Sequence, residues 1–300
     1  MCQWRLEQKS RNQLLQNRCQ TLGLTRGPIT EQWIRENKRR LSRIIVSDEH
    51  RVLYCSMPKV ANTNWKMAFM ILTGRLKRED ALKQPFGAIH KWKDWLLSQL
   101  PDDEILYRLQ NYKSFMIVRH PFHRLLSAFK DKFNSEVPLN REETRLPRNE
   151  IYLKYHNMTP TEVIRGGGNN RTPPAGYRVS FQEFVELVLH QRLHQRADFN
   201  PNSFESHWVS MTNLCLPCLV NYDYIGKLES AHLDTRFILE NIGADNMTDL
   251  VAGQPGAAAH ATNASARVKD TFLNLSDEQM EGLRRMYEHD LKLYDYSPVL

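Results

Sequence analysis

The sequence has no long apolar stretch. No run in its 300 residues approaches the roughly 18 apolar residues of a membrane-spanning helix. The opening, MCQWRLEQKSRNQLLQNRCQ, also lacks the apolar core of a secretion signal. Taken alone, these absences indicate a cytosolic protein or a chain whose membrane segment is missing.

Glycine is absent from one stretch where a phosphate loop would need it. No glycine lies between Val52 and Thr73, where YCSMPKVANTNWKMAFMIL reads as a strand, a turn carrying Lys59, and a helix. The Walker loop of ATPases and GTPases needs G-x-x-x-x-G-K-[ST], whose glycines let the backbone wrap the phosphates. The strand ends VLYCSMP and IVRHP also contain no acidic residue to hold magnesium. The sequence therefore disfavours a P-loop ATPase or GTPase.

Cysteine is scarce and odd in number. The chain has five cysteines: Cys2, Cys19, Cys55, Cys215 and Cys218. At least one thiol must therefore be free or pair with another chain. The C-x-x-C pair formed by Cys215 and Cys218 has no second copy, so half a zinc site, a redox motif and part of a disulfide set all stay open.

What is present is an ordinary globular composition with a basic balance. Hydrophobic residues make up 41% and charged residues 25%, enough for one large core or two modest domains. The net charge of +7 favours polyanionic partners, namely nucleic acid, anionic glycans, membrane surfaces or nucleotides, without choosing among them.

Apolar runs of strand length alternate with helical patterns along the chain. Residues 43–57, RIIVSDEHRVLYCSM, read as two apolar runs split by a polar turn. Phe115–Val118 reads as a buried strand, and CLPCLVNYDYIGKLE holds another. Helices are predicted over 64–73 and 122–133, with Thr63 and Asn64 capping the first. The alternation predicts an α/β fold with a P-loop-like core, a central parallel sheet flanked by helices. No repeat or clear linker appears, which favours one domain.

Two cationic turns follow strands of this predicted sheet. The first carries Lys59 and Lys66, and the second carries Arg119, Arg124 and Ser127. Ligands of open α/β sheets gather at the carboxyl ends of the strands, where helix N-termini attract anions. We therefore expect a ligand with two separated phosphate groups.

Several motifs resemble one family. PKVANTNWK resembles the 5′-phosphosulfate-binding signature of the Golgi carbohydrate sulfotransferases, in the subfamily of chondroitin, dermatan and related N-acetylgalactosamine 4-O-sulfotransferases. VRHPFHRLLSAFKDKF resembles their 3′-phosphate-binding signature, and HWVSMTNLCLPCLVNYDYIGKLE and LYDYSP resemble later family segments. The matches extend from about residue 44 to the C-terminus. One departure is Asn62, where the family usually has cysteine.

The resemblance implies transfer of a sulfuryl group from 3′-phosphoadenosine 5′-phosphosulfate (PAPS) to a sugar hydroxyl, without metal. The implied acceptor is position 4 of N-acetylgalactosamine in chondroitin or dermatan. Lys59 would neutralise the leaving phosphate, and Arg119 and Ser127 would hold the 3′-phosphate. The residues expected around the 5′-phosphate are Pro58, Lys59, Val60, Ala61, Asn62, Thr63, Asn64 and Trp65.

The catalytic base and the acceptor site are less defined by sequence. Histidine is the usual base near neutral pH, and His90 is the first candidate with His207 second. His207 and Arg165 are also acceptor-binding candidates. Arg165 lies in the stretch 141–178, which is rich in arginine. A solvated loop is the alternative for that stretch. The partner expected is an anionic glycosaminoglycan rather than nucleic acid.

The family's location carries further expectations. Members are type II Golgi membrane proteins, so a membrane anchor is expected in the full-length protein, with this chain in the Golgi lumen. Residues 1–43 would then be a helical, stem-proximal segment and 44–300 a single sulfotransferase domain. Cys215 and Cys218 become disulfide candidates. N-glycosylation acceptor patterns occur at Asn157, Asn246, Asn263 and Asn274.

Three other readings stay open. The chain could sulfate another glycan, at position 3 of glucuronic acid or on N-acetylgalactosamine of an N-glycan. It could be a non-catalytic glycan-binding relative, which Asn62 favours slightly. A nucleotide-dependent kinase would require metal and phosphate transfer, which the missing Walker loop argues against.

Overall fold

The computed structural model describes residues 2–25, 27–81, 83, 89, 95–133, 179–191, 200–252 and 268–299. Four strands form one sheet in the order β1-β2-β3-β4: β1 (Ile44–Ser47), β2 (Val52–Cys55), β3 (Lys113–Val118) and β4 (Tyr224–Lys227). β1 and β2 form an antiparallel hairpin, while β2–β3 and β3–β4 are parallel. The predicted α/β class with a mostly parallel sheet is confirmed.

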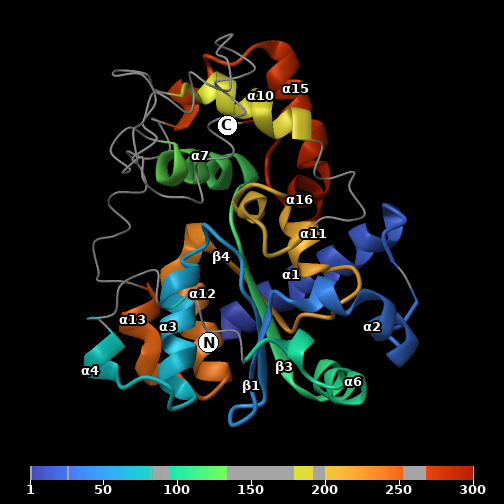
Figure 1. Cartoon of the computed structure of the whole chain (residues 1–300), viewed down its shortest axis with the longest axis vertical. Coiled ribbons are helices and arrows are strands. Elements are labelled where there is room, and N and C mark those ends of the chain that lie inside the picture. Colours follow the sequence, from blue (N-terminus) through green and yellow to red (C-terminus); the bar gives the residue numbers. More distant parts are fainter. Residues whose placement is uncertain are drawn as a thin grey trace, which may run out of the picture.

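Helices surround this sheet (Figure 1). β3 leads upward into α7, and the C-terminal helices lie at the same end of the molecule in that view. The longer helices are α1 (Cys2–Thr21), α3 (Asn62–Leu72), α6 (Asp102–Asn111), α7 (Pro121–Lys132), α10 (Phe181–Gln191), α12 (Ala231–Asn241) and α15 (Asp277–Met286). The shorter ones are α2 (Glu31–Asn37), α4 (Arg78–Ala81), α11 (Met211–Cys215), α13 (Thr248–Ala252) and α16 (Glu288–Leu293). Single 3₁₀ turns are η1 (Lys38–Leu41), η2 (Leu97–Gln99), η4 (Phe204–His207), η5 (Leu228–Ser230) and η6 (Asp245–Met247).

Local sequence explains several helix starts. Thr30 caps α2 by accepting a hydrogen bond from the backbone N–H of Trp33. Ser276 and Gln279 form a capping box at α15. Pro121 occupies the first turn of α7, where a missing N–H has no effect on the helix.

An aromatic cluster joins α3 to the centre of the sheet. Tyr54 stacks on Phe115 with ring centroids 4.8 Å apart, and Trp65 lies 4.8 Å from the same ring. Phe69 completes the cluster at 6.0 Å from Phe115. These four side chains are at most 1% exposed, so α3 is fixed on β2 and β3 by apolar burial.

The first helix seals the outer edge of β4. The side chain of Gln8 accepts a hydrogen bond from the Ile225 N–H at 2.9 Å and donates to the Ile225 carbonyl at 3.2 Å. Arg11 donates to the same carbonyl and pairs with the buried Asp234 at 2.9 Å. An edge strand with unpaired backbone groups is a site of unwanted pairing, and α1 covers it here. No helix among the described residues is both long and apolar enough to cross a membrane.

Candidate active site

The two cationic turns leave the same edge of the sheet. β2 and β3 are parallel neighbours, with Cys55 opposite Met116, so their carboxyl ends lie side by side. The turn after β2 leads into α3, and the turn after β3 leads into α7. The turns also touch, because Nη1 of Arg119 donates to the carbonyl oxygen of Lys59 at 3.2 Å.

The first turn bends without glycine by placing two other residues in the left-handed region. Lys59 has φ of 73° and Ala61 has φ of 61°. This conformation costs about 1–2 kcal/mol for a residue with a Cβ. Ala61 is the N-cap of α3 and makes no side-chain cap bond, so the prediction that Thr63 and Asn64 cap this helix is wrong. The helix begins at Asn62 because the bend at Ala61 already sets its first turn.

Asn62 ties this turn together from inside. Its side chain is buried, and Oδ1 accepts hydrogen bonds from the Ser56 hydroxyl at 2.8 Å and the Tyr54 hydroxyl at 3.2 Å. A thiol is a weak acceptor and could not replace both bonds equally well. The departure from the family's cysteine therefore has a structural role in this chain.

The Lys59 amine is held by a carboxylate on the neighbouring helix. Its Nζ lies 3.2 Å from Oδ2 of Asp131 on α7. Burial lowers the pKa of Lys59 below its ordinary value, although the charge of Asp131 opposes this. Burial raises the pKa of Asp131, but the charges of Lys59 and Lys132 outweigh it and the net pKa is lowered. Nothing in the sequence near Asp131 marks it as a partner of the first turn.

The second turn contains two arginines with different tasks. Arg119 is mostly buried, and burial lowers its pKa against the opposing charge of Glu229. Its bond to Lys59 leaves further guanidinium N–H groups for a ligand. Arg124 is 1% exposed and donates to three carbonyls, those of Pro58 at 3.0 Å, Val209 at 2.6 Å and Ser206 at 2.7 Å. Arg124 therefore fastens α7 to the first turn and to the segment after residue 200.

The remaining predicted site residues are placed as follows. Ser127 is half-buried on α7, and Trp65 is buried in the aromatic cluster. His207 ends η4, beside the Ser206 carbonyl that Arg124 holds. Asn246 and Asn274 are exposed. His90, Arg165, Asn157 and Asn263 lie outside the described residues.

Two disulfides brace this end of the molecule. Cys55, the last residue of β2, is bonded to Cys215, and Cys19 at the end of α1 is bonded to Cys218. The C-x-x-C cysteines thus pair with distant partners rather than with each other. The first bridge fixes the residue just before the Lys59 turn. Within the described parts of the chain, no group of three or more His, Cys, Asp or Glu side chains is arranged to hold a metal ion.

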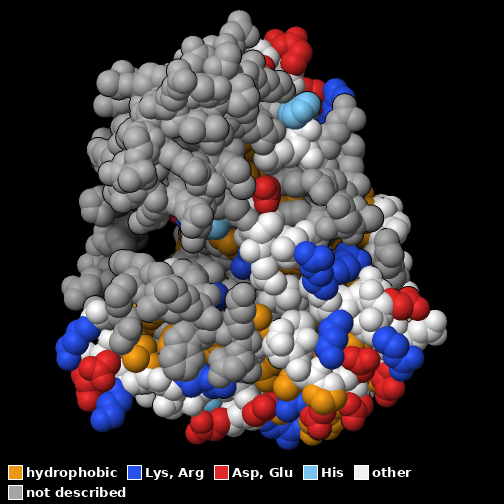
Figure 2. Space-filling view, viewed as in Figure 1, with side chains coloured by type: hydrophobic (Ala, Val, Ile, Leu, Met, Phe, Trp, Pro, Cys, Tyr) orange, Lys and Arg blue, Asp and Glu red, His pale blue; other side chains and the backbone are white. Residues whose placement is uncertain are grey.

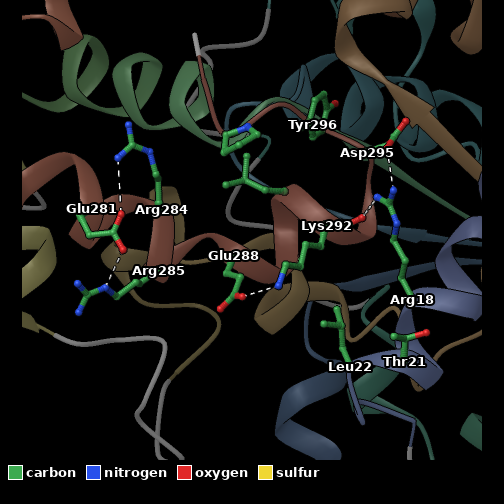
Figure 3. Close-up of a pocket in the computed structure, with 12 residues that line it drawn as sticks. Arg18, Thr21, Leu22, Glu281, Arg284, Arg285, Glu288, Lys292, Asp295 and Tyr296 are labelled. Atoms are coloured by element: carbon green, nitrogen blue, oxygen red, sulfur yellow. Dashed lines mark hydrogen bonds and ion pairs between the residues drawn. The ribbon is translucent and has the colours of Figure 1, made fainter.

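A cavity of about 700 Å³ lies between the end of α1 and the last helices (Figure 3). Its charged side chains pair with one another, in the pairs Arg18–Asp295, Lys292–Glu288, Arg284–Glu281 and Arg285–Glu281. The cations of this cavity are all paired, whereas Arg119 of the second turn has no ion pair among the described residues and is the better candidate for binding an anion.

Residues 42–297 match the Sulfotransferase family, and the chain belongs to that family. Its enzyme class, a sulfotransferase that uses PAPS, is thereby confirmed, and so is its resemblance to the carbohydrate sulfotransferases.

The alignments with two individual relatives cover the same share of this chain. The chain is 34% identical over 259 residues to carbohydrate sulfotransferase 10 of Homo sapiens, covering 86% of this chain and 67% of that protein. It is 30% identical over 261 residues to carbohydrate sulfotransferase 11 of Mus musculus, covering 86% and 68%. No solved structure matches the chain significantly.

Proposed function

We propose that this sulfotransferase transfers a sulfuryl group from PAPS to position 4 of N-acetylgalactosamine in chondroitin or dermatan. The observation that carries the donor part of the proposal is the contact between the two cationic turns, through Arg119 and the Lys59 carbonyl. It places the helix N-terminus that follows Lys59 beside Arg119 of the second turn, at one edge of the sheet. The acceptor position rests on the family resemblance. The names of the relatives, carbohydrate sulfotransferases 10 and 11, support a sugar acceptor.

The residues of the first turn supply electrostatic stabilisation in this proposal. Backbone N–H groups at the start of α3 bind the 5′-phosphate, and its leaving oxygen gains negative charge as the sulfur–oxygen bond breaks. The Lys59 amine exchanges Asp131 for that oxygen and neutralises it. A preorganised cation at a developing charge is among the largest catalytic contributions.

The second turn binds the 3′-phosphate of the donor in this proposal. Arg119 forks onto the 3′-phosphate, with Ser127 donating its hydroxyl to the same group. This contact separates the donor from adenylates that lack a 3′-phosphate. His90 is proposed as the base that takes the acceptor's proton, with His207 as the second candidate.

Two cations close enough to act on each other, the half-buried Arg43 and the buried Lys66, support an anionic acceptor. Arg43 precedes β1, is half-buried and donates from Nε to the Pro201 carbonyl at 2.7 Å, while Lys66 on α3 is 8% exposed. Burial and the charge of Arg43 lower the pKa of Lys66 to about 8. No carboxylate among the described residues acts on either cation. Two like charges partly removed from water favour an anion between them, such as a uronic acid carboxylate.

The visible surface gives no comparable signal. On the face shown in Figure 2, the described basic and acidic side chains are interspersed. Arg43 and Lys66 therefore carry the anionic-acceptor proposal better than any surface patch on that face.

We place the protein in the Golgi lumen. Its two disulfides suit an oxidising compartment, and the exposed Asn246 and Asn274 acceptor patterns suit a glycosylated protein. The family resemblance supports the same location.

A labelled-sulfate assay with a panel of acceptors tests the proposal. The panel contains desulfated chondroitin, desulfated dermatan, a glycan ending in glucuronic acid, and a neutral glycan bearing N-acetylgalactosamine. We expect label at position 4 of N-acetylgalactosamine in the first two, and Lys66→Met to raise KM for them more than for the neutral glycan. Label on glucuronic acid or only on the neutral glycan would assign a different acceptor. Intact donor binding with no transfer to any member would instead indicate the non-catalytic relative.

A further inference from the structure

The C-terminal tail is fastened to the turn that carries Arg119. The Tyr296 hydroxyl donates to Oε2 of Glu229 at 2.8 Å, and Oε1 of Glu229 accepts the His120 backbone N–H at 2.7 Å. The imidazole Nε2 of His120 lies 3.0 Å from the carbonyl oxygen of Ser297. Three elements distant in sequence therefore meet at one turn.

The hydrogen bonds of His120 define its protonation. Its Nδ1 accepts a hydrogen bond from the Phe122 backbone N–H at 3.2 Å, so Nδ1 carries no proton. The proton is then on Nε2, which donates to the Ser297 carbonyl. Burial lowers the pKa of His120, which keeps the ring in this neutral form. The ring thus acts as a fixed link between the tail and the N-cap of α7.

The tail is held from its other side as well. Arg18 of α1 pairs with Asp295 at 2.8 Å and donates to the Lys292 carbonyl, and Tyr296 N–H donates to the Leu291 carbonyl at 2.9 Å. Figure 3 shows Arg18 reaching Asp295 beside Tyr296. The Lys227 amine lies 4.6 Å from the centre of the Tyr296 ring. These contacts restrict where the Tyr296 hydroxyl can point.

Both oxygens of Glu229 are occupied, although its charge is close enough to act on Arg119. One oxygen accepts the His120 N–H and the other the Tyr296 hydroxyl. Arg119 has no ion pair among the described residues, and it donates instead to the Lys59 carbonyl. A carboxylate freed from Tyr296 would be a competitor for the same guanidinium that a phosphate needs.

We propose that Tyr296 is a positioning residue for the donor's 3′-phosphate, because its hydroxyl holds Glu229 away from Arg119. The tail residues Asp295–Ser297 form the strap that sets this geometry. The inference rests on the proposed role of Arg119 in donor binding and adds a residue that acts through another. It concerns selectivity for the 3′-phosphate and not the chemical step.

The test compares two nucleotides that differ only in that phosphate. Binding of adenosine 3′,5′-bisphosphate and of adenosine 5′-monophosphate is measured by calorimetry for the wild type and for Tyr296→Phe. We expect the variant to bind the bisphosphate about tenfold more weakly and the monophosphate equally well. The control Tyr107→Phe removes an exposed hydroxyl on α6 and should change neither affinity.

A second variant separates positioning from general damage. Glu229→Gln has no charge with which to compete for Arg119, so adding Tyr296→Phe to it should produce no further loss of bisphosphate affinity. Unfolding temperatures verify that each variant is folded. An unchanged ratio of the two affinities in Tyr296→Phe, or an equal loss for both nucleotides, would overturn the inference. A wild type that binds both nucleotides equally would overturn the donor assignment itself, and the inference with it.

Discussion

The two turns of the site are built differently. The Lys59 turn has ties within itself, since Asn62 bonds to Tyr54 and Ser56. Its distant contacts are the hydrogen bonds from Arg119 and Arg124 and the ion pair with Asp131. The Arg119 turn is held by residues more than 100 positions away, since His120 binds Glu229 and Ser297. The first turn thus depends in part on its own side chains, and the second depends on the folded C-terminal region.

This difference suggests how the two turns divide their work. A turn with internal ties of its own needs fewer distant contacts to keep its phosphate-binding amides fixed. The position of a turn built from distant contacts can be adjusted through those contacts. We propose that the strap Asp295–Ser297 acts in this way on Arg119, through Glu229. Substitutions in the first turn should therefore act on rate and local stability, and those in the second on donor recognition.

The largest effect is expected at Lys59. Lys59→Ala should lower the rate of sulfate transfer by about 10²- to 10³-fold, because one preorganised transition-state contact contributes that much. The unfolding temperature should stay close to that of the wild type. Steady-state kinetics and calorimetry measure both quantities. Lys130→Ala on the exposed side of α7 is the matched control and should transfer sulfate normally. Normal transfer by Lys59→Ala would show that the amine has no catalytic role.

The next effect is expected at Arg119. Arg119→Ala should weaken binding of adenosine 3′,5′-bisphosphate by about 10- to 100-fold, since hydrogen bonds between charged groups contribute about 1.5–3 kcal/mol. Binding of the monophosphate should change little. Arg119→Lys keeps the charge but loses the fork, so an intermediate affinity is expected. Equal weakening of both nucleotides would instead indicate damage to the whole site.

The sequence alone predicted the elements that local pattern controls. The β1–β2 hairpin, the buried β3 and the helix after Pro121 follow from apolar runs and their spacing. The motifs around Lys59 and Arg119, together with the later segments, also identified the family. The cap of α3 was mispredicted, because the left-handed bend at Ala61 has no signature in a stretch without glycine.

Contacts across long stretches of chain could not be predicted in the same way. No local pattern links Gln8 to Ile225, 217 positions away, or Tyr296 to Glu229, 67 positions away. The ion pair between Lys59 and Asp131 also depends on how α7 packs against the first turn. The odd number of cysteines left the disulfide pairing open. Only the fold brings Cys55 to Cys215 and Cys19 to Cys218.

A smaller effect is expected from opening the internal tie of the first turn. Asn62→Ala leaves the hydroxyls of Tyr54 and Ser56 without their acceptor, which should lower the free energy of unfolding by about 1–3 kcal/mol. Chemical denaturation measures this change. Asn111→Ala on the exposed surface of α6 is the control and should fall within about 0.5 kcal/mol of the wild type. No difference between the two variants would contradict a locally held turn.

The second turn should be sensitive to acid. Burial, then the charges of His120 and Arg119, lower the pKa of His123 to about 4, and burial also lowers that of His120. A histidine with a lowered folded-state pKa contributes stability that is complete above its unfolded pKa, about 6.5, and is lost as pH falls through the folded value. Unfolding temperatures should therefore drop between about pH 6.5 and 4. The drop should be smaller in His123→Asn, and an identical profile would contradict this assignment.

The smallest effect is expected from supplying the missing glycine. Ala61→Gly removes a Cβ from a left-handed position, but it also makes the unfolded chain more flexible. The two effects oppose each other, so the free energy of unfolding should change by less than about 1 kcal/mol. Donor affinity should be retained. A large loss of donor affinity would show that the first turn needs the alanine side chain itself.

The most direct test of the account is single-turnover transfer from sulfur-labelled PAPS to desulfated chondroitin, in the presence of a metal chelator. The account predicts label in the glycan with the wild type and release of adenosine 3′,5′-bisphosphate in equal amount. With Lys59→Ala it predicts a rate reduced by about two to three orders of magnitude at saturating donor. Undiminished transfer by that variant, or transfer that stops when metal is removed, would contradict it.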